Sequence, residues 1–179
     1  MSFNFVKTIL TAVCYSMTAY ISFTHSLAIT GLQFVSRFSI INNITWQKPN
    51  PAPNLACRCF THSTETILWA RKINGRKKGK HFFNYSLMKE INNGKQMKDV
   101  WIMNLPTTSE KRYGKHPTQK PESVIERIML ASTKENDLVL DPFNGSGTTG
   151  VVAKKLNRKY IGIDIEKEFL ELTIARLDS

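Results

Sequence analysis

The sequence is poor in cysteine and shows no obvious metal-binding pattern. Its three cysteines, Cys14, Cys57 and Cys59, are an odd number and include no Cys-x-x-Cys pair. This pattern argues against a disulfide framework and favours a reducing compartment, so we expect a cytoplasmic protein. No histidine cluster stands near the cysteines in sequence. We therefore expect no metal site.

Acidic residues are also scarce, with 14 Asp and Glu against 25 Lys and Arg, which gives a formal net charge of +11. Such an excess suits a polyanionic partner, nucleic acid first and an anionic membrane surface second. Composition alone does not decide between them. The basic, glycine-punctuated run RKINGRKKGK (residues 71–80) is predicted to be a loop, and it suits a solvated surface connection as well as a phosphate contact.

Long hydrophobic runs are limited to residues 3–23, where Lys7 is the only charge. Such a stretch is compatible with a signal peptide or a short membrane segment. Polar residues interrupt it, however, and its small-x-small cleavage pattern is poor. We therefore expect no membrane association, a buried strand at about residues 18–23, and no assignment for residues 1–17.

The rest of the chain alternates between strand and helix patterns. Strands are predicted at residues 39–46, 66–70, 99–103, 137–140 and 160–164, and helices at 26–37, 121–131, 148–156 and 167–177. Strands alternating with helices at the C-terminal end predict an α/β fold with three layers and a mostly parallel sheet.

A glycine loop stands between two of these predicted elements. Gly145, Gly147 and Gly150 form a G-x-G-x-x-G pattern after one strand, and Asp164 ends the next. The first two glycines let the backbone turn sharply and approach a ligand, and the third allows a helix to pack closely on a strand. An acid at that distance is placed to accept hydrogen bonds from ribose hydroxyls. The pattern predicts a nucleoside-binding site.

Three kinds of nucleotide site share features of this pattern. A phosphate-binding P-loop is excluded because no Lys-Ser or Lys-Thr follows the glycines. In a dinucleotide-binding dehydrogenase the glycine pattern opens the domain and several more strands follow it. Here only one strand and one helix follow the pattern, so the order of elements is circularly permuted relative to a dehydrogenase. Asp141 at the end of the first strand would repel a pyrophosphate. It suits a cationic ligand, S-adenosylmethionine, which carries a sulfonium and an ammonium.

Four segments resemble the permuted, β-type DNA N6-adenine or N4-cytosine methyltransferases of restriction–modification systems. They are HPTQKPESVIERIML (residues 116–130), LDPFNGSGTTG (140–150), YIGIDIEKEF (160–169) and the central region at 41–72. The central region is similar to adenine-specific members. The resemblance implies one Rossmann-like, S-adenosylmethionine-dependent methyltransferase domain over residues 18–179, with a target-recognition insert at about 73–115.

The resemblance also implies roles for individual residues. The methionine and ribose parts of the cofactor would contact Asp141, Phe143, Gly145, Ser146, Gly147 and Thr148. Asp164 would accept hydrogen bonds from the ribose hydroxyls, and Thr118 and Lys120 would lie over the methionine end. For His116, a capping or packing role is as compatible as ligand contact.

The sequence departs from the family at the catalytic position, because it contains no Asp-Pro-Pro-Tyr-type run. In the family this run binds the target amino group and stacks on the flipped base. We therefore expect the fold to be incomplete at its N-terminal side and the chain to be inactive alone. Two alternatives stay open: a non-catalytic fragment that binds DNA or the cofactor, or that joins a separate polypeptide supplying the missing half, and a methyltransferase acting on RNA or protein.

Overall fold

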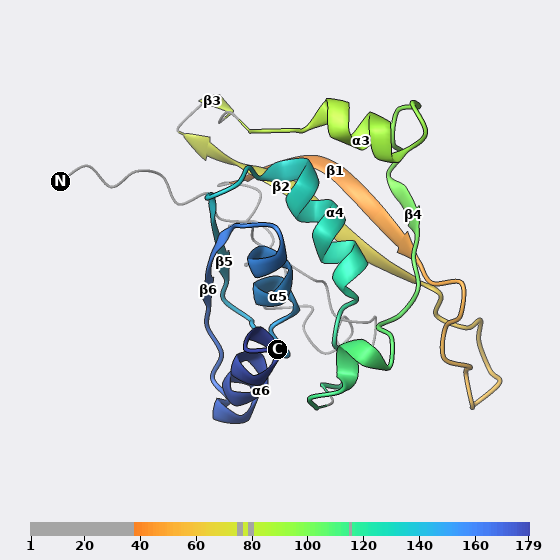
Figure 1. Ribbon diagram of the computed structural model, residues 1–179. Helices are drawn as coiled ribbons and strands as arrows, with labels where there is room; N and C mark the ends of the chain where they lie inside the picture. Colours follow the sequence, from red (N-terminus) through yellow and green to blue (C-terminus); the bar gives the residue numbers. More distant parts are fainter. Residues whose placement is uncertain (1–37, 75–76, 79–80, 115) are drawn as a thin grey trace. The chain divides into compact units, whose positions relative to one another are not determined.

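The computed structural model describes residues 38–74, 77–78, 81–114 and 116–179 (Figure 1). The helix predicted at 26–37 and the strand predicted at about 18–23 lie outside the described residues. The described chain divides into two compact units. We call residues 38–81 with Met97–Ile102 the hairpin unit, and Phe82–Gln96 with Met103–Ser179 the glycine-loop unit.

The hairpin unit holds one four-stranded sheet. Its strands are β1 (Phe38–Gln47), β2 (Thr64–Asn74), β3 (Lys77–Lys78) and β4 (Val100–Ile102), in the order β3-β2-β1-β4. Strand β1 pairs antiparallel with β2 and parallel with β4. In the β1–β4 pair, Trp46 lies opposite Trp101, and both indole side chains are buried.

The sheet of the hairpin unit corrects two expectations. Its β1–β2 and β2–β3 pairs are antiparallel, whereas a mostly parallel sheet was expected. Parallel neighbours need a long crossover, usually a helix, and residues 48–63 between β1 and β2 contain none. Residues 71–80 were predicted to be a loop, but β2 continues to Asn74 and pairs with β3. The prediction took the lysine-rich sequence as a sign of a loop. Lysine is also common in edge strands, and β3 is at the edge of this sheet.

The glycine-loop unit contains helices α3 (Tyr85–Ile91), α4 (Glu122–Ser132), α5 (Thr148–Lys155) and α6 (Lys167–Leu177), and the 3₁₀ turn η1 (Ser109–Lys111). Its strands, β5 (Leu138–Asp141) and β6 (Lys159–Gly162), are parallel neighbours in which Asp141 lies opposite Gly162. Helix α5 is the crossover that makes this parallel pairing possible. The sequence predicted these elements except α3 and η1.

The core of the glycine-loop unit forms between the helices and one face of the β5–β6 pair. It consists of Ile125, Met129, Val139, Val152 and Ala153, with Tyr160 packed against it. A side chain at Gly150 would place its Cβ 2.5 Å from the ring of Tyr160, so α5 can approach β6 this closely only with glycine there. The packing role predicted for the third glycine is confirmed.

The opposite face of β6 is apolar and partly exposed. Side chains alternate along a strand, so Tyr160 and Gly162 face the helices and Ile161 points the other way, with Ile163 following directly after the strand. About half of each isoleucine side chain is exposed. Across the ranges that the structure describes, no helix combines the length and hydropathy that a membrane span requires.

Candidate cofactor site

The glycine loop connects β5 to α5 at the carboxyl end of the strand, and its backbone strongly favours glycine at two positions. Gly145 has φ +50° and Gly147, the residue before α5, has φ +71°. Both lie in the left-handed region, which L side chains avoid. At Gly147 an added Cβ would stand 2.4 Å from Oγ1 of Thr173 on α6. The sharp turn predicted for the first two glycines is thus present.

Asp141 braces the start of the loop. Its side chain is buried, its Oδ1 accepts a hydrogen bond from the backbone N–H of Phe143 (3.1 Å), and its Oδ2 accepts one from the hydroxyl of Thr149 (2.6 Å). Both donors are neutral groups. They orient the carboxylate without supplying the positive charge that would compensate it.

Asp164 holds the loop from the other strand. Its Oδ2 accepts a hydrogen bond from the backbone N–H of Gly145 at 2.6 Å, and its Oδ1 accepts one from the N–H of Glu166 at 3.0 Å. The residue predicted to bind ribose therefore also fixes the position of the glycine loop. Each carboxylate oxygen can accept a second hydrogen bond, so these contacts leave room for a hydroxyl donor.

A buried arginine on α6, which was not predicted from the sequence, holds the glycine loop by hydrogen bonds. Nη1 of Arg176 donates to the carbonyl of Ser146 (2.6 Å) and to Oγ1 of Thr148 (3.1 Å), and Nη2 lies 3.2 Å from Oε1 of Glu122. The only available signal was a basic residue in the last turn of a predicted amphipathic helix, where a helix-dipole role is equally expected. Arg176 positions Ser146 and Thr148, two of the predicted cofactor residues.

A second polar network joins the loop to α6 and β6. Asn144 donates from Nδ2 to Oγ1 of Thr173 (2.7 Å), and its Oδ1 accepts a hydrogen bond from the hydroxyl of Tyr160. Burial raises the pKa of Tyr160 well above its usual value, and Asp141 and Asp164 add to the rise. The phenol therefore stays protonated and acts as a hydrogen-bond donor.

The His-Pro-Thr-Gln-Lys-Pro segment is brought against the loop at two points. Oγ1 of Thr148 donates to the carbonyl of Lys120 (3.2 Å), and an added Cβ at Gly145 would stand 3.2 Å from Nε2 of His116. The ring of His116 also meets that of Phe169 edge to face, with centroids 4.3 Å apart. Desolvation lowers the pKa of His116, with Lys120 adding to the effect and Asp164 opposing it.

Two apolar side chains project from the loop edge into solvent. Phe143 is 79% exposed, and Ile165, directly after Asp164, is 95% exposed. These two side chains leave apolar surface against which an aromatic ligand could pack. Phe143 was predicted from the sequence, whereas Ile165 was not. Thr118 is exposed and lies next to His116, whose Nδ1 is 3.3 Å from the threonine Oγ1.

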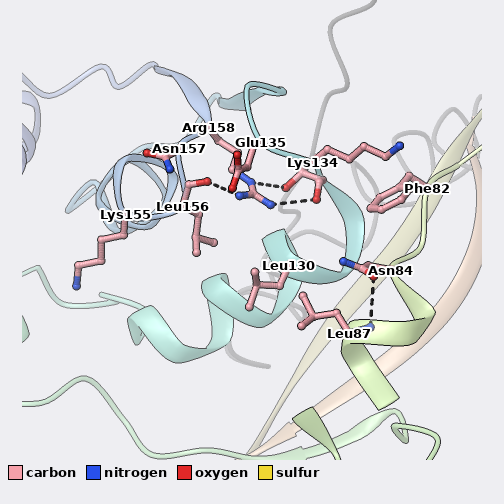
Figure 2. A pocket seen from close by; sticks show the side chains of 11 residues that line it. Phe82, Asn84, Leu87, Leu130, Lys134, Glu135, Lys155, Leu156, Asn157 and Arg158 are labelled. Atoms are coloured by element: carbon pink, nitrogen blue, oxygen red, sulfur yellow. Dashed lines mark hydrogen bonds between the residues drawn. The ribbon is translucent and has the colours of Figure 1, made fainter. Parts of the chain in front are cut away.

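A separate pocket of about 540 Å³ lies at the other ends of the strands (Figure 2). Its walls include residues that immediately precede β5 and β6. Arg158 crosses it and donates from Nη2 to the carbonyl of Thr133 (3.1 Å), tying the α4–β5 link to the α5–β6 link. Because the glycine loop follows β5, this pocket is no part of the candidate site. Within the described ranges no three His, Cys, Asp or Glu side chains are grouped as metal ligands.

The comparisons with known proteins identify the family. The model of the DNA methylase family of N6 and N4 methyltransferases matches residues 6–175, and the chain belongs to this family. It is 70% identical over 141 residues to the type II methyltransferase M2.LlaDCHI of Lactococcus lactis subsp. cremoris, and 68% identical over 142 residues to M2.DpnII of Streptococcus pneumoniae. Each alignment covers 79% of this chain and 52% of the relative. The chain thus spans about half the length of these relatives.

Solved structures support the fold. The M1.HpyAVI–SAM complex matches with a TM-score of 0.68 and 37% identity, covering 87% of this chain and 72% of that one. The PvuII cytosine-N4 DNA methyltransferase matches with a TM-score of 0.64 at 19% identity, which speaks for the fold alone. The fold is therefore the α/β, Rossmann-like methyltransferase fold that the sequence predicted.

Proposed function

We propose that the chain is the cofactor-binding part of a site-specific DNA methyltransferase of a restriction–modification system. It would help to transfer a methyl group from S-adenosylmethionine to the exocyclic amino group of a flipped base, with adenine N6 as the favoured target. The observation that carries this proposal is the glycine loop held between Asp141 and Asp164. The names of the relatives and the complex of M1.HpyAVI with SAM support it. We expect a cytoplasmic protein that acts on DNA.

The residues present fit this cofactor. Both carboxylates are oriented by neutral donors, so their negative charge can favour a ligand that carries a sulfonium and an ammonium. A Cβ at Gly145 would stand 3.2 Å from Nε2 of His116, so glycine there lets the His-Pro-Thr-Gln-Lys-Pro segment approach the loop closely. Phe143 and Ile165 offer apolar surface at the loop edge. When bound, S-adenosylmethionine would supply the electrophilic methyl group, and the proposed contacts are Asp141, Phe143, Gly145, Ser146, Gly147, Thr148, Asp164, Thr118 and Lys120.

Catalysis needs a group that these residues do not supply. No Asp-Pro-Pro-Tyr-type run is present in the sequence, so no acceptor of that kind is available to the target amine. Loss of such preorganised contacts removes roughly 3–4 kcal/mol of transition-state stabilisation per contact. We expect the chain alone to bind the cofactor and to transfer methyl groups at or near the background rate.

Calorimetry on the purified chain tests the cofactor proposal. S-adenosylmethionine and its demethylated product should bind, and nicotinamide dinucleotides should not. Binding of the dinucleotide alone would overturn the proposal. A tritiated-methyl assay on duplex and single-stranded DNA then tests the expected inactivity, which robust incorporation by the chain alone would contradict.

A second candidate function is that of a complementing subunit, whose partner polypeptide carries the Asp-Pro-Pro-Tyr-type motif. The observation that favours it is the apolar face of β6, where Ile161 and Ile163 are about half exposed in the part of the chain that the structure describes. Strands of parallel sheets are normally covered on both faces, so an apolar surface of a partner could pack on this one.

Co-expression tests this second candidate. The chain should co-purify with a polypeptide that carries the missing half, and the pair should methylate DNA when neither does so alone. Ile161→Asp with Ile163→Asp should abolish co-purification, whereas the control Glu171→Gln, on exposed surface of α6, should not. Co-purification that the double substitution leaves unchanged would contradict the candidate.

A further inference from the structure

Among the described residues outside the cofactor site, the two most exposed large apolar side chains lie on one loop of the hairpin unit. Residues 48–63 connect β1 to β2, and we call them the 48–63 loop. Phe60 is 101% exposed and Leu55 is 90% exposed. Burying a side chain of this size is worth about 1.5–3 kcal/mol, and the folded unit forgoes that gain twice here.

The loop is ordered by its own contacts, although it has no regular secondary structure. At its base the N–H of Lys48 donates to the carbonyl of Ser63 (2.7 Å). Farther out, Nδ2 of Asn54 donates to the carbonyl of Cys59 (2.9 Å), and the carbonyl of Asn54 accepts from the N–H of Cys57 (3.1 Å). Three prolines, Pro49, Pro51 and Pro53, restrict the backbone before this turn. The exposed side chains are therefore held on a preorganised scaffold.

The 48–63 loop contains two cations, Lys48 and Arg58, and no acidic residue. The other six Lys and Arg of residues 38–81 belong to residues 71–80, toward and beyond the opposite end of β2, and Glu65 is the one acidic residue in this range. Glu65 is paired with Lys48 at 2.6 Å, and the Lys48 ammonium also lies over the ring of Trp46, 5.2 Å from its centroid. The acid therefore offsets a cation at the base of the loop. Arg58, two residues from Phe60, is exposed.

An exposed aromatic side chain on a preorganised loop, with an exposed arginine two residues away, has the chemistry of a nucleic-acid wedge. Aromatic rings stack on unpaired bases, and apolar side chains enter base steps that have been opened. A negatively charged protein partner would suit Arg58, but it would need no fully projecting phenylalanine beside it. The combination favours DNA with an opened base pair, which is also the state that amino methylation of a base requires.

We propose that the 48–63 loop is a DNA-opening wedge, in which Phe60 stacks on a base left unpaired in the opened duplex, Leu55 adds apolar contact, and Arg58 binds backbone phosphate. This inference rests on the proposed function in one respect, that DNA is the substrate. It adds the part of the chain that would recognise the distorted site. Because every residue involved belongs to the hairpin unit, it is independent of the cofactor contacts.

Fluorescence anisotropy with the full chain tests the wedge. Three labelled probes are compared at one salt concentration: an intact duplex, the same duplex with a single abasic site opposite a normal base, and the single strand. The wild-type chain should prefer the abasic duplex to the intact one. Phe60→Ala should weaken binding to the abasic duplex by about 5-fold or more, the contribution of one stacked base, and binding to the intact duplex by less than about 2-fold.

Two further variants protect the test against misfolding and non-specific effects. Phe60→Trp should keep the preference, and its emission should be quenched by the abasic duplex and not by the intact one. Ile174→Ala, at an exposed position of α6, should change nothing. An unchanged preference in Phe60→Ala, or no preference in the wild type, overturns the wedge alone. Failure to bind all three DNAs, with S-adenosylmethionine still bound, overturns the DNA substrate and the wedge with it.

Discussion

Oδ2 of Asp164 accepts a hydrogen bond of 2.6 Å from the backbone N–H of Gly145, nineteen residues earlier in the chain. This contact joins the segment after β6 to the glycine loop after β5, the neighbouring parallel strand. Because a charged acceptor strengthens the bond, the carboxylate sets the position of the loop as well as the local potential. Substitution of Asp164 should therefore affect cofactor binding through both geometry and charge.

Replacing Asp164 with alanine should weaken binding of S-adenosylmethionine by about 10- to 100-fold, the range expected for losing hydrogen bonds to a charged group. Asp164→Asn should have an intermediate effect, because the amide oxygen can still accept the Gly145 N–H. Isothermal titration calorimetry measures both constants. The control Glu171→Gln removes an exposed carboxylate on α6 and should bind as the wild type does. Equal affinities for Asp164→Ala and the wild type would contradict the ribose role.

Gly147→Ala should destabilise the protein by about 2–4 kcal/mol, because it combines left-handed backbone strain with overpacking. Its φ is +71°, and the new Cβ would stand 2.4 Å from Oγ1 of Thr173. Gly94 is a matched control, since its φ is +76° and no heavy atom lies within 4 Å of the Cβ that alanine would add there. Gly94→Ala should cost only the strain, about 1–2 kcal/mol. Equal losses in urea unfolding would show that contact with α6 is unimportant.

The parts of this fold that the sequence predicted are those set by local pattern. Glycines at Gly145 and Gly147 are needed for backbone angles, and such positions can be read from sequence. Arg176 could not be found in this way, because its partners Ser146 and Glu122 are thirty or more residues away and only folding brings them together. The direction of β2 was equally hidden, since it depends on whether the 48–63 loop contains a crossover helix.

Arg176→Met should cost about 2–4 kcal/mol of unfolding free energy, because it leaves the carbonyl of Ser146 unsatisfied and removes a buried partner of Glu122. The Arg176 side chain is only 4% exposed. Lys155→Met is the matched control, since Lys155 is the other cation paired with Glu122 and its own side chain is 63% exposed. An exposed ion pair of that kind contributes about 0–1 kcal/mol. Chemical denaturation measures the unfolding free energy of both variants. Similar decreases would contradict a stabilising role for the buried Arg176 side chain.

The protein should become less stable as the pH is lowered, because His116 titrates. Desolvation holds the pKa of this imidazole below its ordinary value of 6.5, with Lys120 acting in the same direction and Asp164 against it. Between the folded and unfolded pKa values the unfolded chain binds more protons, so unfolding becomes easier as the pH drops through that window. The stabilisation is complete above about pH 6.5 and is lost below it.

His116→Phe should remove this component while keeping a ring between Gly145 and Phe169. Urea unfolding at pH 7.5 and pH 5.5 gives the decrease in the free energy of unfolding for each protein. The contribution of His116 is the decrease in the wild type minus the decrease in the variant. The wild type should lose more stability than the variant over this interval. NMR titration of the imidazole provides the direct check, and a midpoint at or above 6.5 would show that Asp164 outweighs desolvation at this site.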